Sequence, residues 1–289
     1  MMTQTITLTA PPKNSRLFAK AALGAVPVPL LTARKPTLPD REVRLDGYRV
    51  DPDHLAAYCR ATGLRFGDAL PLTYPFVLAF PLIMQLVVAR DFPFTAVGAV
   101  HAENRIERAR EISVAEPLDF HTHVENLREH PKGLLIDAVT EVKVGREQVW
   151  RQVATMLHQQ KTSLSGAPKP EPKPEEAPPP PLRTLRVDQK TITRYAAASG
   201  DHNPIHTSAV GAKAFGFPKS IAHGMWSAAT ILGIIEGRIP EKTTYAVKFG
   251  KPILLPSTVN LYADQADGGW NLALRHPKKG YPHLTATLR

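Results

Sequence analysis

The sequence contains a single cysteine, Cys59, among its 289 residues. One cysteine cannot form an intrachain disulfide, which excludes the disulfide-stapled scaffolds typical of small secreted proteins. A reducing compartment is therefore expected, and we predict a cytoplasmic location. Cys59 lies in an apparent helix with no general base beside it, so we interpret it as a buried structural thiol rather than a nucleophile.

Runs of positive charge are also missing, although the chain carries a formal net charge of +10 and a sequence pI of about 9.7. The lysines and arginines are scattered and form no recognisable nucleic-acid-binding motif, so no nucleic acid is expected as a partner. A net positive charge still favours an anionic ligand. A phosphate-bearing small molecule and an acidic carrier protein both fit, and charge alone does not choose between them.

No hydrophobic run of membrane-spanning length is free of proline. Residues 69–89 lack charged side chains over nearly the length of a membrane span, but three prolines interrupt them. Residues 16–31 combine basic and apolar residues, yet they begin late for a secretory signal and contain two prolines. A helix enclosed by a sheet is equally apolar on all sides. We therefore expect no integral membrane span.

Proline itself is concentrated in one segment. Residues 169–181 are mainly proline with interleaved Lys and Glu, a composition that cannot form a packed core and favours an extended spacer. We predict an N-terminal domain at residues 1–165, a proline-rich linker at residues 166–182 and a C-terminal domain at residues 183–289. Two domains are typical of a chain of this length.

The parts on either side of the linker have the same pattern at identical spacing. The first has Val50, Asp51, Tyr58 and Gly63, and the second has Val187, Asp188, Tyr195 and Gly200. Each aspartate is a plausible helix N-cap and each glycine the matching stop. An apolar helix is predicted next in each part, at residues 76–88 and 224–235. Strands are predicted at residues 95–101, 139–144 and 149–157 in the first part, and at residues 243–249, 258–262, 270–274 and 283–288 in the second.

Residues 199–206, with the sequence Ser-Gly-Asp-His-Asn-Pro-Ile-His, are the segment most typical of an active site. Gly200 permits the positive φ that ends a helix, and the proline after Asn203 pushes that residue out of helical geometry, so a tight bend is predicted. Such a bend brings Asp201 and His206 together. A carboxylate beside a neutral imidazole is suited to moving protons to and from water.

The first copy lacks this pair of residues. When the copies are aligned on their glycines, Leu64 stands in place of Asp201 and Ala69 in place of His206. The second copy also has about ten more residues before its apolar helix. The second copy is therefore predicted to be catalytic, and the first to supply ligand-binding surface.

Residues 195–206 and 222–225 (Ala-His-Gly-Met) resemble the signatures of MaoC-like (R)-specific enoyl-CoA hydratases. A degenerate first copy before a complete second one is similar to two-domain peroxisomal hydratases and, more closely, to actinobacterial 3-hydroxyacyl-thioester dehydratases. The latter resemblance extends to residues 74–76 and 126–130. It implies an α+β double hotdog fold, in which two antiparallel sheets, each wrapped around a long helix, pair as an intrachain pseudo-dimer.

The resemblance also implies a hydro-lyase that reversibly adds water to a trans-2-enoyl thioester, giving the (R)-3-hydroxyacyl thioester. Asp201 and His206 would activate the water, and Asn203 would orient either that water or Asp201 by hydrogen bonding. The Gly224 N–H would stabilise the thioester oxyanion. His223 and Gly200 are expected to shape the oxyanion and substrate-binding loops. No cofactor or metal is expected, because the thioester already acidifies C2.

Two other functions stay open. Hotdog folds also hydrolyse thioesters, so the chain could be an acyl-CoA thioesterase whose water is aimed at C1. It could also be a non-catalytic acyl-thioester-binding subunit. The paired Asp201 and His206 favour hydration. The sequence leaves open the acyl chain length, the choice between CoA and acyl carrier protein, and whether the chain forms a homodimer.

Several side chains have possible roles that the sequence does not decide. His121 and His123 share one face if their segment is a strand, but no third metal ligand is evident. His202 is interpreted as a turn residue. Candidate contacts to CoA phosphates are Lys213, Lys219, Lys248 and Lys251, and candidate hydroxyls beside the catalytic histidine are Ser227 and Thr230.

Overall fold

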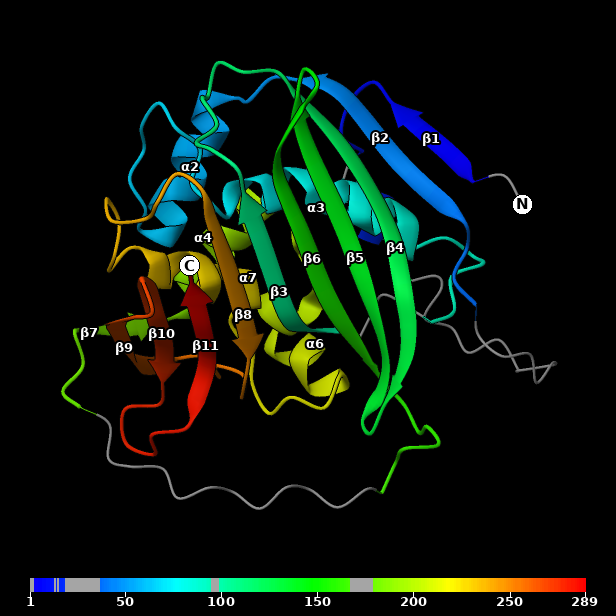
Figure 1. The fold of residues 1–289 in the computed structure, drawn as a ribbon. Coiled ribbons are helices and arrows are strands. Elements are labelled where there is room, and N and C mark those ends of the chain that lie inside the picture. The colour runs from blue at the N-terminus through cyan, green and yellow to red at the C-terminus, as the bar shows by residue number, and fades with distance from the viewer. Residues whose placement is uncertain (1–2, 13, 15, 19–36, 95–98, 167–178) are drawn as a thin grey trace.

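The computed structural model describes residues 3–12, 14, 16–18, 37–94, 99–166 and 179–289 (Figure 1). The first part of the chain forms β1 (Gln4–Leu8), β2 (Arg41–Tyr48), α2 (Pro52–Thr62), α3 (Tyr74–Val87), β3 (Val100–Arg108), β4 (Leu118–His130), β5 (Gly133–Val144) and β6 (Glu147–Gln159). The second part forms β7 (Arg183–Val187), α4 (Gln189–Ser199), α5 (Pro204–Thr207), α6 (Ala209–Ala214), α7 (Gly224–Leu232), β8 (Thr243–Phe249), β9 (Ser257–Ala266), β10 (Gly269–Arg275) and β11 (Pro282–Leu288).

All eleven of these strands belong to one sheet, in the order β1-β2-β4-β5-β6-β3-β8-β11-β10-β9-β7. Apart from β1, the order β2-β4-β5-β6-β3 is repeated in reverse as β8-β11-β10-β9-β7, so the two copies have the same topology. They meet where β3 and β8 pair antiparallel, with Glu103 opposite Lys248 and Arg108 opposite Thr243. The expected double hotdog, paired as a pseudo-dimer within one chain, is the fold of this protein.

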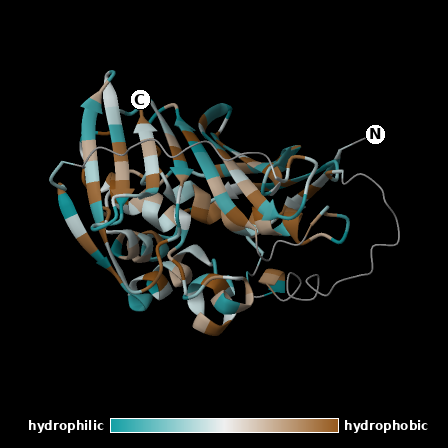
Figure 2. Cartoon of the chain, turned by 90° about the horizontal axis from the view of Figure 1, so that it is seen from below, coloured by the Kyte–Doolittle hydropathy of each residue, from teal (hydrophilic) through white to brown (hydrophobic). Residues whose placement is uncertain are grey.

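The helices lie together on one face of the sheet (Figure 1), and the strands alternate between hydrophobic and hydrophilic residues along their length (Figure 2). This alternation gives each strand one face for the core and one for solvent. Helix α3 contacts β2, β4 and β5, and α7 contacts β10. Each copy therefore wraps its sheet around its own apolar helix.

The predicted helix caps are confirmed in both copies. Asp51 accepts a hydrogen bond from a backbone N–H of the first turn of α2 at 2.9 Å, and Asp188 does the same for α4 at 2.8 Å. Gly63 and Gly200 end these helices in the left-handed region, with φ of 77° and 69°. A glycine at these positions avoids the steric cost that a Cβ atom meets there.

The apolar segment at residues 69–89 is explained by burial. Helix α3 has buried residues on nearly every side, and the predicted helix at residues 76–88 is correct to within two residues at each end. No helix in the described part of the chain is both long and apolar enough to cross a membrane.

The strand predicted at residues 95–101 is only partly correct. Residues 95–98 lie outside the described residues, and β3 continues to Arg108 through a stretch with four charged side chains. One face of this central strand is open to solvent, so its sequence is polar despite its position. Strands β1, β2, β4 and β7 were not predicted, and most of the linker predicted at residues 166–182 also lies outside the described residues.

Residues 126–130, which carry part of the family resemblance, contain a bulge in β4. Asn126 has a φ of 56°, and the pairing of β4 with β5 shifts register there. The bulge brings Arg128 to within 2.9 Å of Asp137 on β5, which also accepts hydrogen bonds from Asn126 and Thr155. This segment therefore fixes the shape of the first sheet.

Candidate active site

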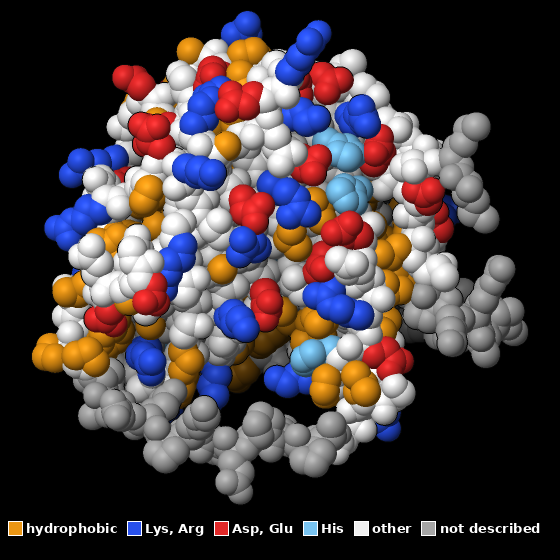
Figure 3. All heavy atoms as spheres, in the orientation of Figure 1, with side chains coloured by type: hydrophobic (Ala, Val, Ile, Leu, Met, Phe, Trp, Pro, Cys, Tyr) orange, Lys and Arg blue, Asp and Glu red, His pale blue; other side chains and the backbone are white. Residues whose placement is uncertain are grey.

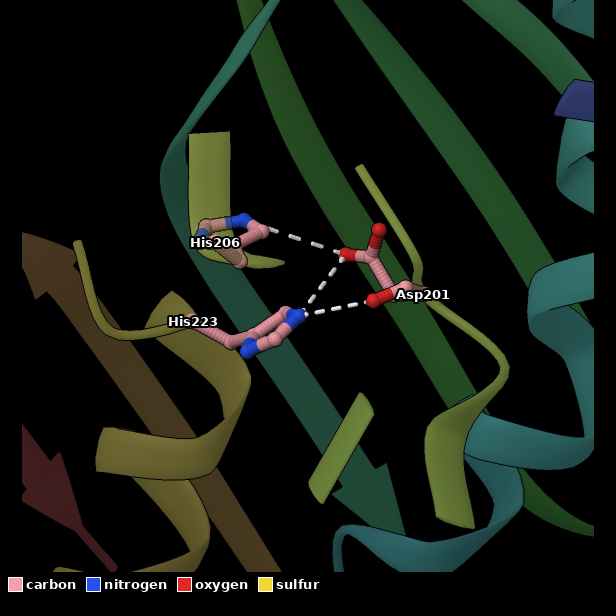
Figure 4. Close-up of side chains that lie close together, drawn as sticks. All are labelled: Asp201, His206 and His223. Carbon is pink, nitrogen blue, oxygen red and sulfur yellow. Dashed lines mark hydrogen bonds and ion pairs between the residues drawn. The ribbon is translucent and has the colours of Figure 1, made fainter. Parts of the chain in front are cut away.

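Three segments of the second copy converge beside the N-terminus of α7. Asp201 directly follows the glycine that ends α4, and His206 lies in the one-turn helix α5. His223 is the N-cap residue of α7, and Gly224 is its first residue. The bend predicted at residues 199–206 is therefore present, and it places residues that are separate in sequence around one point (Figure 4).

Asp201 lies opposite two imidazoles (Figure 4). Its Oδ2 atom is 4.0 Å from Nε2 of His206 and 3.8 Å from Nε2 of His223. These separations are too long for direct hydrogen bonds. A water molecule about 2.8 Å from both Oδ2 of Asp201 and Nε2 of His206 fits this spacing.

The hydrogen bonds of His206 fix its tautomer. Nδ1 lies 2.9 Å from the carbonyl oxygen of Ile221, which only accepts, so Nδ1 carries the hydrogen and Nε2 a lone pair. Burial lowers the pKa of His206, and the nearby charge of Asp201 and the Ile221 bond only partly oppose this effect. His206 is thus neutral at neutral pH, with its basic nitrogen turned to Asp201.

His223 holds the backbone of the catalytic loop. Its Nε2 donates to the carbonyl oxygen of Asp201 at 2.9 Å, and its ring stacks on that of His206 with centroids 3.7 Å apart. Burial, helped by the neighbouring His206, holds the pKa of His223 well below its ordinary value. It lies within the site, and its contacts agree with the predicted role in shaping the loop.

Asn203 hydrogen-bonds Asp201, one of the two partners expected for it, through its main chain rather than its side chain. Its side-chain oxygen accepts from the Ile205 N–H at 3.3 Å and caps α5, while its backbone N–H donates to Oδ1 of Asp201 at 3.1 Å. Asn203 thus orients Asp201 through its main chain, because its side chain is needed to start α5. Gly200 also has a structural position: it is the C-cap of α4, and a Cβ there would collide with the side chain of Asn14.

The Gly224 N–H is available for a ligand. It opens α7, where the first N–H groups lack partners within the helix, and within the described part of the chain no other group accepts from it. The helix dipole favours negative charge at this end. A Cβ on Gly224 would lie 3.1 Å from Cε1 of Phe249, so the position has little room for a larger residue.

A cavity of about 590 Å³ joins this site to the first copy. Asp201, His206, His223 and Gly224 line one part of it. Helix α3 contributes a stripe of side chains at helical spacing to another part, namely Phe76, Phe80, Ile83, Met84 and Val87. The apolar helix of the first copy therefore forms a wall of the cavity that contains Asp201 and His206.

Some contributors to the site had no usable signal in the sequence. The Ile221 carbonyl is a backbone group, and any residue provides one. Phe249 ends β8, far from the signatures in sequence, and reaches Gly224 only because the sheet curves around α7. Tyr195, buried with its ring 5.0 Å from that of His223, is a repeat position and the first residue of the signature at residues 195–206, but the sequence assigns it no role of its own.

The four lysines considered as contacts to CoA phosphates lie in two different places. Lys248 and Lys251 line the cavity, whereas Lys213 and Lys219 are exposed outside its lining. Neither candidate hydroxyl holds His206, whose ring is held by the Ile221 carbonyl. The Ser227 hydroxyl donates weakly to the carbonyl of His223, and the Thr230 hydroxyl has no partner among the described residues. His202 is exposed, as a turn residue should be, and His121 and His123 share one face of β4 beside carboxylates, with Nε2 of His121 2.7 Å from Glu42.

Asp201, His206 and His223 are also the one group of potential metal ligands found among the described residues, with their ligating atoms within 4.8 Å of one another. The hydrogen bonds argue against metal binding. Nε2 of His223 donates to the Asp201 carbonyl and thus carries a hydrogen, and Nδ1 of His206 donates to Ile221. The free imidazole nitrogens are Nε2 of His206 and the buried Nδ1 of His223, which has no partner among the described residues. Only Nε2 of His206 is free on the side of the Asp201 carboxylate, and this pair suits proton transfer better than a metal centre.

Comparisons with known proteins agree with this arrangement. The MaoC like domain matches residues 169–275. The 3-hydroxyacyl-thioester dehydratase X of Mycobacterium tuberculosis is 52% identical over 278 residues, which cover 96% of this chain and 98% of that protein.

Solved structures show the same relationship. A crystal structure of HtdX from Mycobacterium tuberculosis has a TM-score of 0.79 at 54% identity and covers 85% of this chain and 98% of its own. A MaoC-like dehydratase from Phytophthora capsici, 18% identical, has the same fold with a TM-score of 0.68 over 85% of this chain and 94% of its own. Because identity above 50% extends over nearly the whole sequence, this chain belongs to the family of MaoC-like dehydratases.

Proposed function

We propose that this protein reversibly hydrates trans-2-enoyl thioesters to (R)-3-hydroxyacyl thioesters. The observation that carries the proposal is the pair of proton acceptors, Oδ2 of Asp201 and Nε2 of His206, 4.0 Å apart in the wall of an acyl-sized cavity. The 52% identity to a protein named 3-hydroxyacyl-thioester dehydratase supports the same reaction.

The two acceptors would hold one water by both of its hydrogens, which leaves the oxygen lone pairs free to attack C3. As the O–C3 bond forms, the pair takes one proton from the water and delivers that same proton to C2, so both residues end in the state in which they began. The C2=C3 double bond becomes a single bond, so all atoms are conserved. Acid–base help of this kind is typically worth about 10²–10⁴ in rate.

Negative charge develops on the thioester oxygen during this step. The Gly224 N–H, at the N-terminus of α7, would stabilise that charge by donating a hydrogen bond from a position that is already fixed. Loss of one such donor in other enzymes costs about 10²–10³ in turnover. His223 would hold the Asp201 main chain and the His206 ring in fixed positions relative to the Gly224 N–H.

The acyl chain would lie along α3. The stripe from Phe76 to Val87 gives the cavity an apolar wall in the first copy, which favours chains longer than the four carbons of crotonyl substrates. Residues 1–165 would thus act as the chain-binding domain and residues 183–289 as the catalytic domain. A cytoplasmic location, a homodimer and the identity of the thiol carrier stay predictions.

The decisive assay is the hydration of trans-2-enoyl-CoA by the purified protein, with chiral analysis of the product. Wild-type protein is expected to give the (R)-3-hydroxyacyl-CoA. Asp201→Asn and His206→Ala should each lower kcat by at least about 10², while His202→Ala, an exposed neighbour, should leave kcat unchanged.

Other products would identify the competing functions. Release of free CoA without a hydroxyacyl product would indicate a thioesterase. Binding of enoyl-CoA without turnover, unchanged in both variants, would indicate a non-catalytic binding subunit.

A further inference from the structure

An exposed helix face lies beside the cavity. In α6, Ala212 is buried and Gly211 packs against Pro204, so the opposite side of the helix faces outward. That side holds Val210, which is 80% exposed, and Lys213 three residues later. Phe215, at the end of the helix, is 38% exposed. Large apolar side chains grouped on a surface are a common sign of an interaction site.

Two more exposed residues lie near Ile221, which lines the cavity. Lys219 is exposed two residues earlier, and Ile221 forms a β-bridge with Leu254, which is 37% exposed. We call the surface formed by Val210, Lys213, Phe215, Lys219 and Leu254 the α6 patch.

The α6 patch borders the cavity that contains the active site. Pro204 and Phe217, on either side of α6, line this cavity, as do Ile221 and Lys251. The backbone N–H of Phe217 donates to Ala212 at 2.9 Å, which ties the end of α6 to the cavity wall. A partner seated on the patch would therefore lie next to this part of the cavity wall.

The surroundings of the patch are cationic. From His202 to Ile235 the chain contains lysines but no Asp or Glu. Lys132, Lys248 and Lys251 line the cavity, and among the described residues only Lys248 of these three is paired with a carboxylate, Glu103 at 3.7 Å. In Figure 3, Lys and Arg side chains flank the hollow at the lower edge of the molecule. This charge suits an acidic partner.

We propose that the α6 patch docks an acidic carrier protein that delivers the enoyl group on a phosphopantetheine arm; the inference rests on the proposed function. The lysines would pair with carboxylates of the carrier, and Val210 and Phe215 would cover apolar side chains of its docking helix. Coenzyme A would use the lysines at the cavity but has no apolar surface to cover Val210. The exposed apolar residues therefore favour a protein carrier over CoA.

The test compares one enoyl group on two carriers. Values of kcat/KM are measured for the same trans-2-enoyl chain linked to CoA and to the source organism's own acyl carrier protein. The variants are Lys213→Glu and Val210→Asp, and the control is Lys143→Glu, which makes the same charge change at the far end of β5 from Lys132. None of these residues belongs to the catalytic site.

Both patch variants should lower kcat/KM for the carrier-linked substrate by about tenfold or more and change the CoA-linked value by less than about twofold. Lys143→Glu should change neither. Equal losses on both substrates, or none on either, would overturn the proposal. A third outcome would also overturn it: Val210→Asp changes the molecular mass of the protein in solution without a selective loss of kcat/KM for the carrier-linked substrate. The patch would then join two copies of this chain.

The proposed function and the docking proposal fail in different ways. If only the CoA-linked chain is hydrated, the proposed function stands and docking is wrong. If neither thioester is hydrated, the proposed function is wrong, and titration of the enoyl-loaded carrier against wild type and Lys213→Glu still decides docking. Binding that weakens at least about tenfold in Lys213→Glu supports it, and equal or absent binding refutes it.

Discussion

The imidazole rings of His206 and His223 are stacked, with centroids 3.7 Å apart and planes inclined by 28°. Each ring also donates to a backbone carbonyl, His206 to Ile221 and His223 to Asp201. Two protonated imidazoles could not share this geometry, because they would repel each other within a buried site. The arrangement therefore keeps both rings neutral and leaves one basic nitrogen, Nε2 of His206, beside the Asp201 carboxylate.

The first prediction concerns the pH dependence of hydration. Burial lowers the pKa of His206 from its ordinary value of 6.5. The base must be neutral to accept a proton, so a lowered pKa keeps it active into mildly acidic solution. The value of kcat/KM should be level near neutral pH and fall only below pH 6.5, on the acid side. A decline beginning above pH 7 would contradict a buried, neutral His206.

A second prediction separates the roles of the two histidines. His223→Phe keeps a ring that can stack on His206 but removes the hydrogen bond to the Asp201 carbonyl. We expect kcat to fall by about 10- to 100-fold, corresponding to one hydrogen bond and the loop it holds. The variant should retain more hydration activity than His206→Ala. If His223→Phe is as inactive as His206→Ala in single-turnover assays, His223 takes part in proton transfer itself.

Gly224→Ala tests the proposed oxyanion donor. The added Cβ meets Phe249 at 3.1 Å, so either the ring or the start of α7 must shift by a few tenths of an ångström. Misplacing the donor should lower kcat by about 10²-fold. Melting temperature should change little if the ring yields. Gly237→Ala, at a glycine with positive φ that is not in the cavity lining, should instead reduce stability and leave kcat intact.

A fourth prediction concerns chain length. Val87→Trp places a large ring at the α3 wall of the cavity, far along the stripe from Phe76. We expect kcat/KM for a twelve-carbon enoyl thioester to fall while that for the four-carbon substrate is kept, because only the longer chain needs this space. Equal values for both substrates would show that the acyl chain takes another path.

The bulge in β4 should matter for stability rather than for catalysis. The Asp137 carboxylate accepts from Arg128, Asn126 and Thr155, and the hydrogen bonds from these side chains outweigh burial and lower its pKa. Asp137→Ala removes the hydrogen bonds from these three side chains and is expected to reduce the free energy of unfolding by about 1–3 kcal/mol. Denaturant unfolding measures this effect.

The same carboxyl gives a pH dependence of stability. Its pKa is lower in the folded state than in the unfolded state, so its contribution is present above about pH 3.8 and is lost as pH falls through its folded pKa. The Asp137→Ala variant should lack this part of the acid-induced loss. An unchanged acid profile would show that the carboxyl is not stabilised in the fold.

Local chemistry in the sequence determined much of this protein. The caps Asp51 and Asp188 and the stops Gly63 and Gly200 are short-range signals, since they depend on backbone geometry within a few residues. Their repetition at identical spacing revealed the two copies. The bend at residues 199–206 was predicted for the same reason, and with it the meeting of Asp201 and His206.

Only the tertiary structure decided what surrounds that pair. The Ile221 carbonyl that sets the His206 tautomer, the stacking of His223 and the contact of Phe249 with Gly224 depend on long-range packing. The side-chain oxygen of Asn203 accepts from the Ile205 N–H and caps α5, so it is not available to orient Asp201. The sequence predicted ligand-binding surface in the first copy, but the shared cavity that α3 lines together with Asp201 and His206 depends on the pairing of β3 with β8. Contacts between segments far apart in sequence leave no local pattern, because they are set by how sheets curve and helices pack.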